Sequence, residues 1–231
     1  MQITWLGHSA FRLQFGGATI LIDPFLKGNP AFEGATMSFD QATEGTTHVL
    51  LTHGHDDHIG STVEICQATG ATLYAGFELG SYLAGKGVAN VELMNPGGTV
   101  AADGFKVSLT DALHSSSSEG VYLGTACGVV VTPDSDAPAV YHMGDTDVFP
   151  GMSLINEFYQ PEIGLVPIGD RFTMGAKGAA YACRTYFHFK HILPCHYGTF
   201  PIIDQTADAF VDLMTGHRVH VPKPGETIEV D

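Results

Sequence analysis

The sequence predicts an α/β fold in which two β-sheets pack face to face and helices cover their outer sides. Three observations support this fold class. The 231 residues are 44% hydrophobic and only 15% charged, as is typical of a compact chain with a large core. Strand-like and helix-like runs alternate along both halves of the chain. The 28 glycines and 12 prolines supply the turns between them.

The first fifty residues are dominated by short strands. Apolar and polar residues alternate in three pieces that are broken by Gly7 and by the pair Gly16 and Gly17, a pattern typical of antiparallel strands. The apolar run THVLLT predicts a buried strand, whereas the segment 28–45 shows no period and is predicted to be a loop. The predicted strands of this region are 1–6, 10–15, 18–22 and 47–52.

The remainder of the chain mixes helices with strands. Gly70 and Gly85 each follow a helix-like run and are expected to end it. The predicted helices are 59–69, 77–84, 176–187 and 204–214. The predicted strands are 71–75, 91–94, 105–109, 128–132, 140–142, 163–167, 191–194, 218–221 and 227–230. Because no linker, repeat or low-complexity tract separates these elements, we expect one domain over residues 1–231.

Composition and charge exclude several classes of partner. No apolar run approaches the roughly 20 residues of a membrane-spanning helix, and the first residues lack the pattern of a secretory signal, so we expect a cytoplasmic protein without a membrane partner. The net charge of −15 disfavours nucleic acid, which requires clustered basic residues. We expect reduced, mostly buried cysteines because the four are scattered without a C-x-x-C pair: Cys66, Cys127, Cys183 and Cys195.

Three histidines and two aspartates lie within the six-residue run HGHDDH, directly after the buried strand at 47–52. His53 and His55 are two residues apart in an extended segment, so their side chains project to one side. Asp57 and His58 lie one turn further on, near the start of the next helix. Two such pairs of nitrogen and oxygen ligands could each serve one metal ion. This density predicts a metal site rather than a polar surface loop.

An H-x-H-x-D-H run after a hydrophobic strand resembles the signature of the metallo-β-lactamase superfamily. That family has four further elements, and each has a counterpart here in the expected order. The counterparts are Asp23 in LIDP, His114 in DALH, Asp145 in HMGDT and His196 in LPCHYG. The resemblance therefore spans nearly the whole chain, and it implies a four-layer αββα sandwich.

The resemblance also implies the roles of these residues around two divalent metal ions. The first ion would be held by His53, His55 and His114, and the second by Asp57, His58 and His196. Asp145 would bridge the two ions, and Asp23 would accept a histidine N–H and so fix the orientation of that ring. Zinc suits this histidine-rich set best, although Mn²⁺, Fe²⁺ or Ni²⁺ also bind nitrogen and oxygen ligands.

Two further segments are similar to bacterial and archaeal metal-dependent hydrolases related to ascorbate-6-phosphate lactonases. They are GHSAF at 7–11 and IGDRFTMG at 168–175. In the first, His8 is a candidate catalytic residue, as a proton donor or a substrate contact, with a structural turn histidine as the alternative. In the second, Asp170 and Thr173 are candidate substrate-pocket residues. Arg171 would supply a cation for an anionic substrate or face solvent.

The expected activity is metal-dependent hydrolysis of an ester, lactone or phosphodiester of a small molecule, with Asp57 orienting the nucleophilic water. A serine-hydrolase elbow, a Walker motif and a dinucleotide-binding glycine motif are all absent. Two alternatives remain open, a glyoxalase-like thioesterase and a non-catalytic metal-dependent binding or regulatory module. The loops 28–45 and 115–120 are expected to set the substrate, and a homo-oligomer is compatible with the sequence.

Overall fold

The computed structural model describes residues 1–231 and contains two large β-sheets and one small hairpin. The first sheet has the strand order β15-β1-β2-β3-β4-β5-β6, and the second has the order β14-β13-β12-β11-β8-β7. The strands of the first sheet are β1 (Gln2–Trp5), β2 (Phe11–Phe15), β3 (Ala18–Ile22), β4 (His48–Leu50), β5 (Thr72–Gly76), β6 (Val91–Met94) and β15 (Thr227–Glu229). Those of the second are β7 (Thr99–Ala102), β8 (Phe105–Asp111), β11 (Cys127–Pro133), β12 (Val140–His142), β13 (Ile163–Pro167) and β14 (His191–Cys195). The hairpin pairs β9 (Ser117–Ser118) with β10 (Val121–Tyr122).

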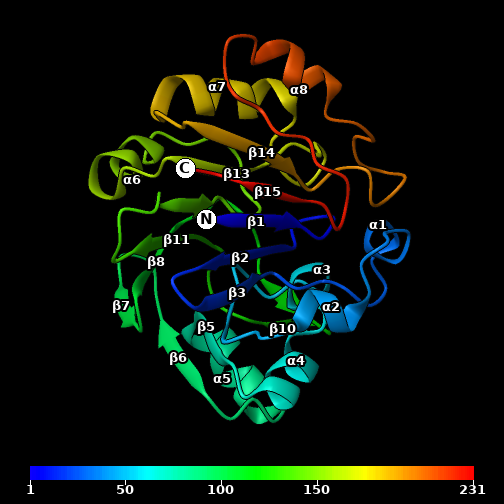
Figure 1. Ribbon diagram of the computed structural model, residues 1–231, viewed down its shortest axis with the longest axis vertical. Coiled ribbons are helices and arrows are strands. Elements are labelled where there is room, and N and C mark those ends of the chain that lie inside the picture. The colour runs from blue at the N-terminus through cyan, green and yellow to red at the C-terminus, as the bar shows by residue number, and fades with distance from the viewer.

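Helices cover the outer sides of the two sheets. Figure 1 shows α6, α7 and α8 gathered at one end of the molecule and α4 and α5 at the other, with the strands between them. The helices are α1 (Pro30–Glu33), α2 (Phe39–Thr43), α3 (Asp56–Ile59), α4 (Thr62–Thr69), α5 (Phe77–Gly85), α6 (Met152–Tyr159), α7 (Ala176–Tyr186) and α8 (Asp208–Leu213). The predicted four-layer αββα fold is confirmed. None of the helices is long and apolar enough to span a bilayer.

The alternation of side chains along the strands builds two apolar cores. In β3, Ile20 and Ile22 belong to the large core that includes side chains of the second sheet, whereas Leu21 belongs to a smaller core that includes side chains of α4 and α5. This is the two-residue period of a strand whose two faces are both covered. It explains why the strand ATILI is apolar throughout and fully buried.

Parallel strands bring several loops to one edge of the sandwich. In the first sheet β3, β4 and β5 run parallel, and in the second sheet β12, β13 and β14 do so. Polar residues gather at the carboxyl ends of such strands because the loops there face a common space, as in other α/β proteins. The candidate metal ligands all lie in segments that follow strand ends, after β4, β8, β12 and β14.

The prediction of a loop over 28–45 was wrong, because this segment contains two short helices. Asn29 accepts hydrogen bonds from the backbone at the start of α1, and Pro30 occupies the first helical position. Ser38 and Gln41 form a reciprocal capping box at the start of α2. Local capping chemistry, rather than a long apolar period, therefore specifies both helices.

The predicted helix 59–69 differs from the structure at its start. Helix formation begins at Asp56, stops at Gly60 and resumes at Thr62. Gly60 adopts a φ of +44°, and a Cβ there would lie 2.4 Å from Phe25 Cα. The close approach of the chain at Phe25 therefore separates α3, which carries candidate metal ligands, from α4, which matches most of the predicted helix.

The structure differs from the predicted elements in three further respects. The predicted strand 218–221 is reduced to a single bridge between Ile192 and Val219, and the prolines that follow it cannot donate ladder hydrogen bonds. The predicted helix 204–214 begins only at Asp208, because the backbone of Asp204 pairs with Gly169 and Gly198 instead. The sequence did not predict α6, β7 and the hairpin β9–β10.

Candidate metal centre

One buried carboxylate lies at the centre of the histidine cluster. The Oδ2 atom of Asp145, which follows β12, lies near the Nε2 atoms of four histidines. The four distances are 3.0 Å to His196, 3.4 Å to His58, 3.5 Å to His114 and 4.0 Å to His53. The side chain of Asp145 is 2% exposed, so water does not screen these contacts. Asp145 thus connects residues from three other segments of the chain, which follow β4, β8 and β14.

The first group of ring nitrogens on one side of Asp145 comes from His53, His55 and His114. His55 Nδ1 lies 3.0 Å from His53 Nε2 and 3.3 Å from His114 Nε2. An imidazole nitrogen that faces two others at this distance can satisfy at most one of them through a shared proton. Three converging nitrogens are instead the arrangement expected of neutral imidazoles around a cation.

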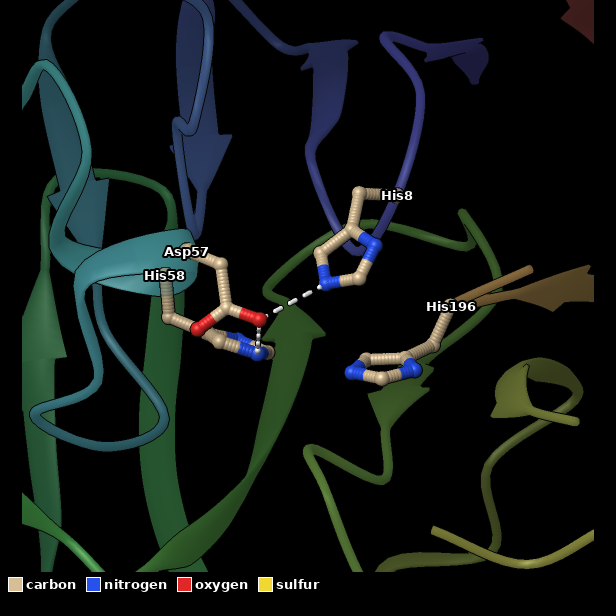
Figure 2. Close-up of side chains that lie close together, drawn as sticks. All are labelled: His8, Asp57, His58 and His196. Atoms are coloured by element: carbon tan, nitrogen blue, oxygen red, sulfur yellow. Dashed lines mark hydrogen bonds and ion pairs between the residues drawn. The ribbon is translucent and has the colours of Figure 1, made fainter. Parts of the chain in front are cut away.

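The second group consists of His8, Asp57, His58 and His196. Figure 2 shows that these side chains approach one another from three segments, namely the turn between β1 and β2, helix α3 and the end of β14. His8 Nε2 lies 3.0 Å from Asp57 Oδ2, and His58 Nε2 lies 3.9 Å from the same oxygen. The group therefore offers the partly exposed carboxylate of Asp57 and three imidazoles as ligands for a second cation.

Asp23, at the end of β3, controls the orientation of two of these histidines. Its Oδ2 accepts a hydrogen bond from His58 Nδ1 at 2.7 Å and one from the Thr52 hydroxyl at 2.6 Å. Because the Thr52 hydroxyl donates to Asp23, its oxygen accepts from His53 Nδ1, 3.0 Å away. Both rings are thereby held with Nδ1 protonated and Nε2 turned toward Asp145.

The backbone at the site is strained at three of the functional residues. His8, Asp23 and His196 adopt φ angles of 54°, 45° and 57°, in the left-handed region that side chains other than glycine rarely occupy. Such strain persists only where surrounding contacts hold it, and it concentrates at functional sites. One such contact is the His196 amide, which donates to the carbonyl of His8; the Trp5 indole donates to the same carbonyl.

Burial and neighbouring charges shift the pKa values of the site, in a direction that differs from group to group. Burial lowers the pKa of His53 well below its usual value. Burial alone would also lower the pKa of His58, but the carboxylates of Asp145, Asp23 and Asp57 together raise it. Burial would raise the pKa of Asp145, yet His196 and His58 hold it well below the ordinary range. The carboxylate of Asp145 is therefore ionised at neutral pH.

These residues fit a divalent cation on two grounds. The ion-pair partners of Asp23, Asp57 and Asp145 are all histidines, so no lysine or arginine neutralises the three carboxylates. In addition, His58 Nε2 and Asp145 Oδ1 are buried without a hydrogen-bond partner. Buried polar atoms are rarely left unpaired, and a bound cation would satisfy both atoms and the excess negative charge.

A pocket of about 350 Å³ opens onto the cluster. Its lining comprises His55, Asp57, His114, Ser115, Asp145, Phe172 and His196. Ser115 belongs to the predicted substrate loop 115–120, and its hydroxyl lies 3.3 Å from His55 Nε2. None of the residues 28–45, the other predicted substrate loop, lines this pocket, because α1 and α2 pack elsewhere.

The structure separates the other predicted pocket residues from this lining. Asp170 is exposed, and the Thr173 hydroxyl donates to the carbonyl of Met174; neither side chain lines the pocket. Phe172, which the sequence did not single out, occupies the wall instead. His8 has no exposed surface, and both ring nitrogens are occupied, by Asp57 and by Thr199. His8 therefore lies behind Asp57 and not on the pocket wall, and its catalytic role stays a prediction.

Comparison with known proteins agrees with the fold and the cluster. Residues 2–196 match the family model described as a beta-lactamase superfamily domain. A UPF0173 metal-dependent hydrolase of Agrobacterium fabrum is 57% identical over 235 residues and 99% of both chains. A UPF0173 metal-dependent hydrolase of Methylocella silvestris is 54% identical over 97% of both.

Among solved structures, Igni18, a metallo hydrolase of the archaeon Ignicoccus hospitalis, superposes with a TM-score of 0.86 at 34% identity. It covers 100% of this chain, which covers 99% of Igni18. The narrower resemblance to ascorbate-6-phosphate lactonases stays a prediction. The chain belongs to the metallo-β-lactamase superfamily, and within it to the metal-dependent hydrolases.

Proposed function

We propose that the chain hydrolyses a small-molecule ester, lactone or phosphodiester with a binuclear centre, most readily of zinc. His53, His55 and His114 would hold one ion, Asp57, His58 and His196 the other, and Asp145 would lie between them. The observation that supports two ions best is the position of Asp145 Oδ2, within 4.0 Å of ring nitrogens that belong to both groups. Divalent cations at such a site supply Lewis acidity and a water of lowered pKa.

Asp57 is the residue that we assign to orient the attacking water. Both Asp57 and Asp145 line the pocket, but the side chain of Asp57 is 29% exposed and that of Asp145 only 2%. His8 acts on Asp57 from behind. Because the ionised Asp57 carboxylate can only accept, the Nε2 of His8 carries the proton and donates to Asp57 Oδ2. In a neutral His8 the Thr199 hydroxyl then donates to Nδ1, 3.1 Å away, in place of the Tyr197 carbonyl at 3.3 Å. Burial, and then the neighbouring His196, lower the pKa of His8 to about 4, which favours this neutral form. His8 is thus a positioning residue for Asp57.

Metal analysis and a substrate panel on one preparation test the proposal. On a panel that also contains thioesters, we expect about two zinc equivalents per chain and hydrolysis of at least one ester, lactone or phosphodiester that chelation abolishes. One tightly bound ion per chain would contradict the binuclear assignment. Full metal loading without turnover on the whole panel would contradict the hydrolase and support a binding module. Turnover confined to thioesters would support the thioesterase alternative.

The positioning role of His8 has its own test. His8→Phe removes the hydrogen bond to Asp57, and we expect kcat to fall about 10- to 100-fold, as is usual for partners of metal ligands. KM and the thermal midpoint should change little. His8→Gln keeps an N–H near the position of Nε2 and should recover part of kcat. An equal loss of kcat in both variants, or a fall in thermal stability that parallels the fall in kcat, would show that His8 has only a structural role.

A further inference from the structure

Phe172 is the one apolar side chain on the wall of the metal pocket, and nothing described so far gives it a role. The other lining residues are the candidate ligands and Ser115. The phenyl ring is 49% exposed, so it is not a core residue. A half-exposed aromatic ring beside a polar site offers a ligand a flat carbon surface.

The loop that carries Phe172 is strained and held in place. Asp170 and Arg171 both adopt left-handed backbone angles, with φ of 58° and 53°. Two such residues in succession are unfavourable unless surrounding contacts hold them. Here Gly169 bridges Gly175, and the Asp170 amide donates to the carbonyl of Met174 at 3.2 Å. The Phe172 amide donates to the carbonyl of Asp170. These contacts hold the backbone that carries the ring at the pocket.

Arg171 supports the ring from outside the pocket. Its guanidinium carbon lies 5.5 Å from the centroid of the Phe172 ring, within the range of a cation–π contact. Arg171 is not among the lining residues and forms none of the ion pairs of the chain. It therefore contacts the ring without lining the pocket.

The charge around the pocket disfavours an anionic substrate tail. No lysine or arginine lines the pocket, so a carboxylate or phosphate remote from the reacting centre would find no cationic partner there. The net charge of −15 remains strongly negative with two divalent ions bound, so away from the ions it adds a long-range repulsion for anions. An uncharged group is free of both effects. The pocket thus combines a flat apolar wall with a bias against negative charge.

We propose that Phe172 is the specificity-determining residue of the pocket and selects substrates with an uncharged, planar apolar group next to the scissile bond. This inference deepens the proposed hydrolase function and rests on it, because only a protein with turnover has a substrate to select. The selection itself is a property of binding, so it is measured without turnover.

The test uses hydroxamates, which chelate metal ions, as probes of the dialysed, zinc-loaded protein. Acetohydroxamate carries a methyl group and benzohydroxamate a phenyl group, and titration calorimetry gives the ratio of their affinities. We expect wild type to prefer benzohydroxamate, and Phe172→Ala to reduce this preference about fivefold, the scale of an aromatic contact. Phe158→Ala removes an equally large side chain, 71% exposed on α6 and outside the pocket lining, and should leave the ratio unchanged.

Two further arms address Arg171 and charge. Arg171→Ala should reduce the preference less than Phe172→Ala does, and Arg171→Lys should restore it.

A para-carboxylate on benzohydroxamate should weaken binding, more so at low salt. Tighter binding of this anion, lost in Arg171→Ala, would overturn the selection of uncharged groups. An equal ratio in wild type and Phe172→Ala, or no saturable binding of either probe, would overturn the role of Phe172. A changed ratio in a protein without turnover would overturn only the proposed function.

Discussion

At the scale of single residues, Asp145 concentrates the electrostatics of the centre. Asp145→Asn keeps the shape of the side chain but removes the negative charge that faces four imidazoles. Loss of a residue that hydrogen-bonds to a metal ligand costs about 10- to 100-fold in metal affinity or activity. Because Asp145 is itself a proposed ligand, we expect Asp145→Asn to lower metal content and kcat/KM by more than this. Elemental analysis and kcat/KM on the same sample provide the measurement. Asp147→Asn, in an exposed side chain two residues away, is the control and should match wild type.

Thr52 allows the influence of Asp23 on His53 to be separated from its influence on His58. Thr52→Val removes the hydroxyl that links Asp23 to His53 and leaves the bond from His58 to Asp23 intact. Asp23→Asn weakens both links. We therefore expect zinc affinity, measured by competition with a chromophoric chelator, to fall in both variants and to fall further in Asp23→Asn, by about 10- to 100-fold. An affinity of Thr52→Val equal to wild type would show that the hydroxyl does not orient His53.

The sequence predicts the residues of the centre better than the residues of its pocket, for a physical reason. A metal centre needs several ligands of a few residue types, and His53 to His58 present four of them in one run. Phe172 is one of 14 phenylalanines, and whether such a ring is buried or lines a pocket depends on the packing of distant segments. The hydrogen bond from His8 to Asp57 likewise joins residues 49 positions apart.

At the scale of elements, the turn after β13 is fitted closely to the turn after β14. A Cβ on Gly169 would lie 1.9 Å from the carbonyl oxygen of His196, so Gly169→Ala forces the two turns apart. We expect a loss of about 1–3 kcal/mol in the free energy of unfolding, the usual cost of overpacking, and a lower zinc content. Urea denaturation with elemental analysis measures both.

Gly85→Ala is the matched control for that substitution. Gly85 ends α5, has open space around its Cβ position and lacks a positive φ. Alanine there should be neutral or should stabilise the fold by about 0.5 kcal/mol, because it restricts the unfolded chain. If both variants unfold alike, the contact between Gly169 and His196 does not constrain the site.

Element prediction succeeded for short strand-like runs and failed where local or tertiary hydrogen bonds decided the structure. The strands 91–94, 140–142 and 163–167 match the structure residue for residue, because each is a short run with clear apolar character. The helices α1 and α2 have only four and five residues, and their sequence features are caps rather than apolar periods. Capping residues in the segment 28–45 could have indicated them.

At the scale of the whole molecule, metal binding and folding are coupled. The proposed ligands come from both sheets, at the ends of β4, β8, β12 and β14, so an unfolded chain cannot hold the ions in the same way. A ligand present at 100 times its dissociation constant stabilises the native state by about 2.7 kcal/mol. For a chain of this size, chelation should therefore lower Tm by roughly 5–10 °C. Zinc should restore it, and Asp145→Asn should respond less. An unchanged Tm in wild type would contradict this coupling.

The hydrogen bond from the Trp5 indole to the carbonyl of His8 gives the chain an optical reporter of its own. Trp5 is the single tryptophan, its ring stacks on Tyr197 at 5.1 Å, and the same carbonyl accepts the amide of His196. Any shift of His196 on metal loading therefore reaches the only strong fluorophore of the protein within a few bonds. Intrinsic emission can follow occupancy of the centre continuously, in a stopped-flow mixer, without a label or a substrate.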